Sequence, residues 1–106
     1  MNKIIIGLVL VIAFATTANA ESKAEVCSSM ETFAGEVMDA RQVGVGAKDA
    51  YRVVNNIDGA GEELKETMRV IIKLAYKVPQ YDNDVEISLA VDAFKKMIFS
   101  SCVDNL

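Results

Sequence analysis

Residues 27–46 have the sequence C-S-S-M-E-T-F-A-G-E-V-M-D-A-R-Q-V-G-V-G, and this stretch decides the fold. At about 100° per residue, its apolar side chains fall within one arc of a helical wheel, whereas Glu31, Glu36 and Asp39 point away. This pattern predicts an amphipathic helix that packs on a core. Gly44 tolerates the left-handed backbone that ends many helices, and Val45 is then placed to fold back onto the last turn. The apolar arc contains Val26, Cys27, Met30, Phe33, Ala34, Val37 and Met38.

Arg41 breaks this pattern, because it lies on the wheel among the apolar residues. In the interpretation that we favour, its charge complements the carbonyl end of the helix while its alkyl stem covers apolar surface. In the alternative, Arg41 and the adjacent Gln42 make a bidentate contact with a carboxylate of this chain or of a partner. The two interpretations differ in whether the arginine is available for binding.

The first 20 residues have the features of a secretory signal peptide. Lys3 gives a basic start, an uncharged apolar run covers residues 4–15, and A-N-A at 18–20 is a small-x-small cleavage site. A membrane anchor needs roughly 20 apolar residues, more than this run provides. We therefore expect cleavage after Ala20, a single mature domain at residues 21–106, a periplasmic or secreted location, and no stable membrane insertion.

The mature chain is acidic. Lys3 is the only charged residue before position 21, so residues 21–106 keep 15 acidic residues and 10 of the 11 basic ones, a net charge of −5. Charge of this sign argues against nucleic acid and anionic lipid as partners. It favours a protein, a sugar or a small molecule.

Cys27 and Cys102 both remain after cleavage. An even number of cysteines in an oxidising compartment predicts one disulfide, which would close a loop of about 76 residues. A zinc site is a weak alternative, because the chain has no histidine to complete the usual ligand shell. We expect neither a metal nor another cofactor.

Two more helices are predicted in the middle of the chain. Apolar residues recur at helical spacing over residues 47–57, with Gly46 as the cap, and again over residues 61–77. Pro79 disfavours helical geometry at Val78 and ends the second of these helices. We expect the helix over residues 61–77 to be the most buried element.

Asn83 followed by Glu86 fits a capping box and opens a last helix that runs to about Cys102. Cys27 and Cys102 lie on the apolar stripes of the first and last helices, so their bond would make these helices antiparallel neighbours. Four helices with short connections predict an all-α fold, a small four-helix bundle.

Two loops contain residue types that bind ligands in other proteins. The glycines of residues 55–61 have no preceding strand and no Lys-Ser or Lys-Thr pair, so a turn is favoured over a phosphate site. Asp82, Asn83 and Asp84 resemble the start of a calcium loop, but Ile87 and Ala93 occupy its required glycine and acid positions. Capping is the favoured interpretation there.

Phe99 and Val103 fall away from the apolar stripe of the last helix. If they are exposed together with Met97, they form an apolar patch suited to a partner or to a second copy of the chain.

Three short sequence features lie along the mature chain: M-x-x-R-Q-x-G-V at residues 38–45, A-Y-x-x-P-x-Y at residues 75–81, and a closing spacing from Phe94 to Cys102. Together they resemble a family of small exported helical proteins with two cysteines, encoded by phages and Gram-negative bacteria. The resemblance implies periplasmic localisation and a disulfide, and no particular activity. It marks four residues for testing: Arg41, Gln42, Tyr76 and Tyr81.

We expect a binding or regulatory protein rather than an enzyme. The chain lacks histidine, its cysteines are expected to be bonded, and Ser28 and Ser29 have no evident base. A small, rigid, acidic domain suits an inhibitor of a cationic protein partner such as a cell-wall hydrolase. The alternatives are an acid-stress periplasmic chaperone, which protonation of 15 carboxylates would open, and a structural homodimer through Phe99.

Overall fold

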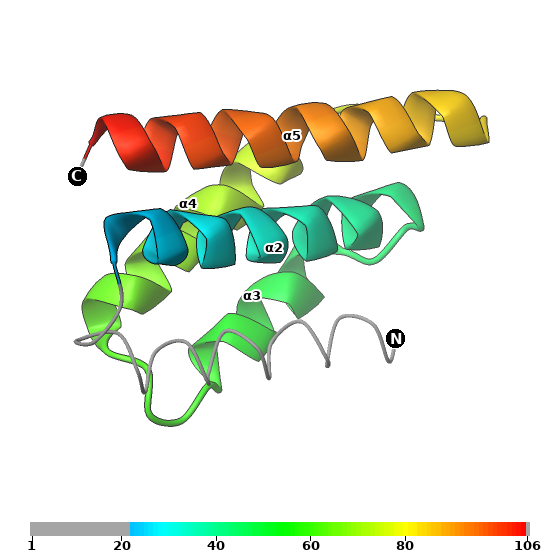
Figure 1. Cartoon of the computed structure of the whole chain (residues 1–106). Helices are drawn as coiled ribbons and strands as arrows, with labels where there is room; N and C mark the ends of the chain where they lie inside the picture. The colour runs from blue at the N-terminus through cyan, green and yellow to red at the C-terminus, as the bar shows by residue number, and fades with distance from the viewer. Residues whose placement is uncertain (1–21, 106) are drawn as a thin grey trace.

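The computed structural model describes residues 22–105, which form helices and no strand. This arrangement confirms the all-α fold class (Figure 1). The signal peptide and its cleavage site lie outside the described residues. The elements are α2 (Lys23–Gln42), α3 (Ala47–Asn55), α4 (Glu62–Ala75) and α5 (Asp84–Asp104).

Helix α2 lies at the centre of the bundle and contacts the other three helices: α5 lies along one side of it, α3 on the opposite side, and α4 crosses behind it (Figure 1). Nine residues of α2 are buried, against four of α4. The prediction that the helix over residues 61–77 is the most buried element is therefore wrong. The reason is topological, because α2 packs against all three other helices and α4 presents its outer side to solvent.

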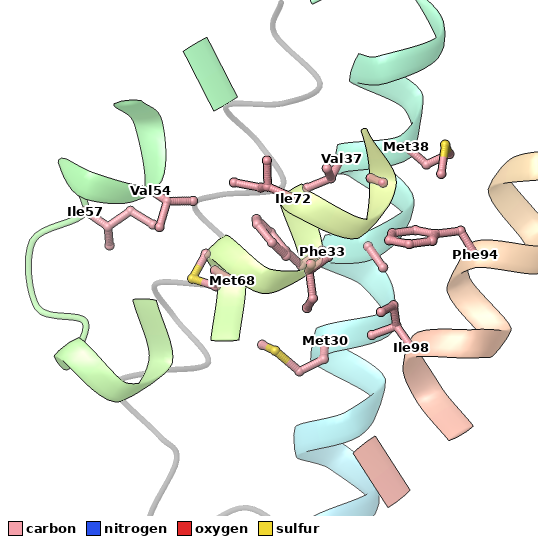
Figure 2. Packing of buried hydrophobic residues seen from close by; sticks show 13 residues of the cluster. Met30, Phe33, Val37, Met38, Val54, Ile57, Met68, Ile72, Phe94 and Ile98 are labelled. Atoms are coloured by element: carbon pink, nitrogen blue, oxygen red, sulfur yellow. The ribbon is translucent and has the colours of Figure 1, made fainter. Parts of the chain in front are cut away.

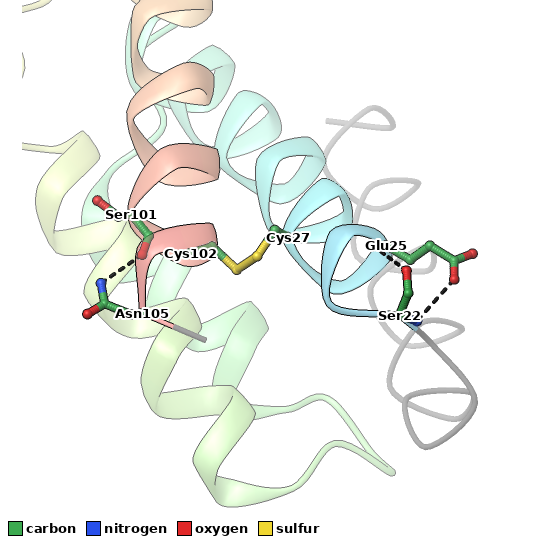
Figure 3. Close-up of a disulfide and its surroundings, with 6 residues drawn as sticks. All are labelled: Ser22, Glu25, Cys27, Ser101, Cys102 and Asn105. Atoms are coloured by element: carbon green, nitrogen blue, oxygen red, sulfur yellow. Dashed lines mark hydrogen bonds between the residues drawn. A yellow bond between two sulfur atoms is a disulfide. The ribbon is translucent and has the colours of Figure 1, made fainter.

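The start of α2 is fixed by a capping box at Ser22 and Glu25 (Figure 3). The Glu25 backbone N–H donates to Ser22 Oγ at 3.2 Å, and the Ser22 N–H donates to Glu25 Oε1 at 3.1 Å. These two bonds satisfy donors that the first turn leaves without helical partners. The helix consequently begins one turn before Cys27.

The end of α2 is a Schellman motif, in agreement with the left-handed helix end that the sequence predicted at Gly44. Gly44 has φ of +93°, the Val45 N–H donates to Ala40 O at 2.9 Å, and the Gly44 N–H donates to Arg41 O at 3.2 Å. The two bonds satisfy carbonyls of the last turn and reverse the chain toward α3.

Replacing Gly44 by alanine should lower the free energy of unfolding by about 1–2 kcal/mol, because a Cβ atom makes a left-handed backbone unfavourable. Gly46→Ser is the matched control in the same turn, since Gly46 caps α3 with φ of −71° and serine is a better cap. Urea unfolding of both variants measures the difference. Equal free energies of unfolding for the Gly44→Ala and Gly46→Ser variants would contradict the prediction.

Helices α3 and α4 end two residues earlier than predicted, at Asn55 and Ala75. At both ends the backbone tightens into hydrogen bonds between residues three apart: the Ile57 N–H donates to Val54 O and the Val78 N–H donates to Ala75 O. Such bonds satisfy terminal carbonyls without extending the α-helix.

Helix α5 begins as predicted after Asn83, whose side chain accepts from the Glu86 N–H at 2.9 Å. The reciprocal half of the capping box differs, because the Glu86 carboxylate accepts from the Asn83 side-chain amide rather than from its backbone. The helix continues to Asp104, beyond Cys102.

A disulfide joins Cys27 to Cys102, as predicted, with 5.5 Å between the Cα atoms (Figure 3). It ties the first turns of α2 to the last turns of α5, so the two helices run antiparallel (Figure 1). A disulfide of this kind fits an oxidising compartment. Among the helices of residues 22–105, none has the length and hydropathy that a bilayer crossing requires.

All four helices contribute to one core (Figure 2). Phe33 and Val37 of α2 lie between Ile72 of α4 and the side chains of α5. On α5 only Phe94 and Ile98 are buried, because this helix packs mainly against α2. The labelled core residues are Met30, Phe33, Val37, Met38, Val54, Ile57, Met68, Ile72, Phe94 and Ile98.

Candidate functional site

The four motif residues Arg41, Gln42, Tyr76 and Tyr81 meet at one end of the bundle. We call them, with the backbone groups that they contact, the Arg-Gln latch. Arg41 and Gln42 end α2, whereas Tyr76 and Tyr81 flank the connection between α4 and α5. The latch therefore joins two connections that are far apart in sequence.

Gln42 is the centre of the latch and is only 4% exposed. Its Nε2 donates to Pro79 O at 2.8 Å, and its Oε1 accepts from the Tyr81 backbone N–H at 2.8 Å. Gln80 Nε2 adds a weaker bond to Gln42 O at 3.3 Å. One buried amide thus satisfies both a carbonyl and an N–H of the loop before α5.

Arg41 Nε donates to Val78 O at 2.9 Å, and the guanidinium carbon lies 5.4 Å from the centre of the Tyr76 ring. The ring contact has the geometry of a cation–π interaction. Arg41 is half-buried in the last turn of α2. These contacts are to a backbone carbonyl and a ring, rather than to a carboxylate of residues 22–105.

Tyr76 completes the latch, because its hydroxyl donates to Val45 O at 2.7 Å. This bond holds the turn after α2 against the end of α4. Phe99, the fifth candidate, is half-buried near the disulfide end of α5 and takes no part in the latch.

The pKa of the Tyr76 hydroxyl is raised above the ordinary value of 10.0, first because burial disfavours the phenolate. Arg41 opposes this rise and Asp49 adds to it. The folded protein therefore holds this proton where the unfolded chain releases it, so stability is present below about pH 10 and is lost as the pH rises through the folded pKa.

Tyr76→Phe tests this linkage. The wild type should be more stable than the variant at neutral pH, and this advantage should shrink as the pH rises from about 8 to about 11. Urea unfolding across this range measures it. The other tyrosines are common to both proteins, so a difference that stays constant with pH would contradict the assignment to Tyr76.

A groove of about 450 Å³ lies between α2 and α3, beside the latch. We call it the α2–α3 groove. Val45, which the Tyr76 hydroxyl holds, forms part of its wall, and the exposed pair Asp49 and Arg52 is joined at 3.0 Å on its rim. Its lining is mostly apolar: Phe33, Glu36, Val37, Ala40, Gly44, Val45, Gly46, Asp49, Ala50, Arg52, Val53, Val54 and Ile72.

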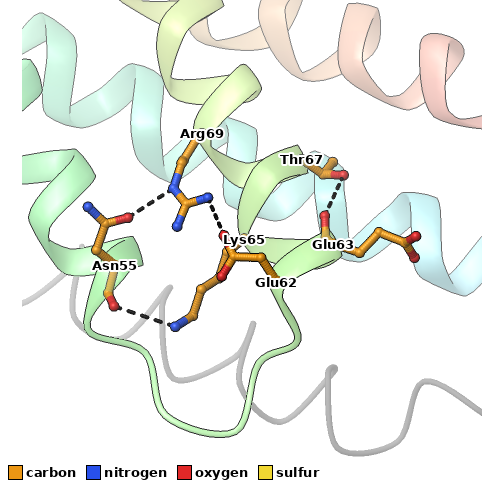
Figure 4. A network of polar contacts seen from close by, with 6 residues as sticks. All are labelled: Asn55, Glu62, Glu63, Lys65, Thr67 and Arg69. Carbon is orange, nitrogen blue, oxygen red and sulfur yellow. Dashed lines mark hydrogen bonds and ion pairs between the residues drawn. The ribbon is translucent and has the colours of Figure 1, made fainter.

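A polar network braces the loop between α3 and α4 (Figure 4). Arg69 Nε donates to Asn55 Oδ1 at 2.9 Å, and its Nη1 lies 2.8 Å from Glu62 Oε2. The hydrogen bond from Arg69 lowers the pKa of the Glu62 carboxyl. Lys65 Nζ adds a long bond to Asn55 O at 3.4 Å. The network holds α3, and with it one side of the groove, against α4.

The chemistry that the described residues offer is set by the groove, the bonded cysteines and the charged rim. Within residues 22–105, no group of three potential ligands lies close enough to hold a metal ion. The cysteine sulfurs are bonded to each other, which removes them as nucleophiles. What the described residues offer is an apolar groove with a charged rim, held in shape by the latch.

The sequence motifs identified the latch residues and missed both their pairing and the groove. The nearest signal was the position of Arg41 and Gln42 at the end of an apolar stripe. The fold and the site together define a disulfide-bonded, all-α domain with a preformed groove. Comparison with protein-family models, with curated proteins and with solved structures found no match to this chain.

Proposed function

We propose that the chain is a small periplasmic or secreted binding protein that inhibits a cationic cell-wall hydrolase. The observation that carries the proposal is the α2–α3 groove, since an apolar recess of about 450 Å³ can accept an anchoring side chain of a protein partner. Binding would exclude substrate from the enzyme and requires no chemistry from the inhibitor.

Rigidity supports this role. The disulfide fixes α2 against α5, the latch fixes the turn after α2, and the network at Arg69 fixes the loop before α4. A preorganised groove loses little conformational entropy when a partner binds. In this proposal Arg41, Gln42, Tyr76 and Tyr81 act indirectly, because they hold the groove wall in place.

Charge supports the choice of a cationic partner. The mature chain has a net charge of −5, and exposed carboxylates lie at the starts of both α4 and α5. An acidic protein attracts a basic enzyme during diffusion and accelerates association at low salt. The proposed complex should therefore weaken as the ionic strength rises.

Ala50→Trp tests the role of the groove. Ala50 is half-buried in the lining, so an indole there should fill the recess and reduce binding at least about tenfold. Ala24→Trp is the matched control, because Ala24 is exposed in the first turn of α2 and does not line the groove. The readouts are calorimetric binding of the oxidised protein to a purified cationic lysozyme and the lytic activity of that enzyme.

Inhibition that Ala50→Trp abolishes and Ala24→Trp preserves would support the proposal. No binding to any wall hydrolase would overturn it. Suppression of client aggregation at low pH, without hydrolase binding, would instead favour the acid-stress chaperone.

A further inference from the structure

The outer face of α5 carries a second regular pattern that the core does not use. Phe94 and Ile98 face α2, whereas the residues on the opposite side of the helix recur at alternating intervals of four and three. This is the spacing of a coiled-coil seam, in which a and d positions meet a second helix. The seam consists of Val85, Leu89, Asp92, Lys96, Phe99 and Val103.

The seam is accessible in the single chain. Val85 is 69% exposed, Leu89 62% and Val103 46%, and Phe99 is half-buried. Figure 1 shows α5 at the edge of the bundle, packed on α2, and no other helix of residues 22–105 lies on its outer side. Exposed apolar side chains in a row along one helix face are a feature of interaction sites.

The order of residues in the seam is complementary to itself. When a second α5 lies antiparallel, Val85 faces Val103 of the second copy and Leu89 faces Phe99 of the second copy. At the centre, Asp92 then faces Lys96 of the second copy. Each of these pairings occurs twice about the two-fold axis, as in an isologous dimer. In an antiparallel coiled coil an a position meets a d position, and all three pairings satisfy this requirement.

The two central charges also select the orientation. In a parallel arrangement, Asp92 would face a second aspartate and Lys96 a second lysine, and both contacts would be repulsive. In the antiparallel arrangement both contacts are attractive. Three of the exposed residues next to the seam are small: Ser88, Ala93 and Ser100. Small flanking residues permit the two helices to approach closely.

We propose that this face of α5 binds the same face of a second copy of the chain, with the helices antiparallel. The seam from Val85 to Val103 extends over roughly 27 Å of helix at 1.5 Å per residue. A contact of this length without further elements is small for an obligate dimer, so the assembly should dissociate on dilution. Because α5 and α3 lie on opposite sides of α2, both α2–α3 grooves remain accessible in the dimer (Figure 1).

Charge reversal followed by mixing tests the proposal. Asp92→Lys would place two lysines at each central contact, and Lys96→Asp would place two aspartates there. Each variant alone should dimerise at least about tenfold more weakly than wild type. Mixed in equal amounts, the two variants restore opposite charges at both central contacts, so heterodimers should form. Sedimentation equilibrium of the oxidised proteins over a range of concentrations measures the masses.

Two further variants keep the result interpretable. Lys73→Asp reverses a charge on the exposed side of α4 and should dimerise like wild type. Leu89→Gln changes no charge, removes an apolar pairing and should weaken the dimer about tenfold. Circular dichroism confirms that each variant is folded.

A concentration-dependent wild-type dimer that mixing restores would support the proposal. A wild type that stays monomeric at every concentration would overturn it, as would single variants that dimerise like wild type or a mixture that remains monomeric. Hydrolase binding at the α2–α3 groove is measured separately, so either proposal can fail alone.

Discussion

Replacing Cys27 and Cys102 together by alanine is expected to lower the free energy of unfolding by about 4 kcal/mol. The bond links residues 75 positions apart and so restricts the whole segment between Cys27 and Cys102 in the unfolded chain. In the folded protein it holds the beginning of α2 beside the end of α5. For a domain of this size, a loss of that magnitude is a large part of the usual net stability of about 5–15 kcal/mol.

Urea unfolding of the oxidised wild type, the reduced wild type and the double variant measures this effect. The reduced wild type and the double variant should have similar free energies of unfolding, because both lack the bond. The reduced wild type keeps the native sequence, so this agreement would assign the loss to the bond rather than to the alanines. A loss below about 1 kcal/mol in both would show that the helices hold their arrangement without the disulfide.

Gln42→Met is expected to lower the free energy of unfolding by about 2–3 kcal/mol, although methionine nearly preserves the volume of the side chain. The substitution removes the donor to Pro79 O and the acceptor for the Tyr81 N–H, and both lost bonds are partly buried. A polar group that loses its partner in a buried position costs more than the lost bond itself.

Gln80→Met is the matched control for this prediction. Gln80 is exposed and makes a 3.3 Å bond to Gln42 O, so its replacement should change stability by less than about 0.5 kcal/mol. If the two methionine variants lose the same stability, the latch is not centred on Gln42.

The sequence predicted the elements whose signals are local. The apolar stripe of residues 27–46, the left-handed Gly44 and the cap at Asn83 each depend on neighbouring residues, and the structure contains all of them. The disulfide was predictable because only one pairing of two cysteines exists. With that pairing, the antiparallel placement of the first and last helices followed.

The candidate site was less predictable, because its contacts are not local. Gln42 and Pro79 are 37 residues apart, and helical periodicity carries no information about which loop a buried glutamine will meet. Helical periodicity also could not show that α2, rather than the helix over residues 61–77, would be the most buried element. The position of α2 between the other helices is a property of the tertiary fold. The wheel marked Arg41 as unusual without showing that its partners would be Val78 O and the Tyr76 ring.

The structure also relates the two sequence motifs to each other. Residues 38–45 supply the arginine, the glutamine and the turn, whereas residues 75–81 supply the carbonyls, the N–H and the tyrosine hydroxyl that they contact. A substitution in one motif should therefore weaken the other. In the proposed function both would affect partner binding through the shape of the groove wall.

Hydrogen exchange at the Tyr81 amide tests the latch most directly, because this N–H donates to the side chain of Gln42 at 2.8 Å. We expect the Tyr81 amide to exchange much more slowly than the amide of the exposed neighbour Asp82 in the wild type, and we expect Gln42→Met to remove the difference. Equal exchange rates at Tyr81 and Asp82 in the wild-type protein would contradict it.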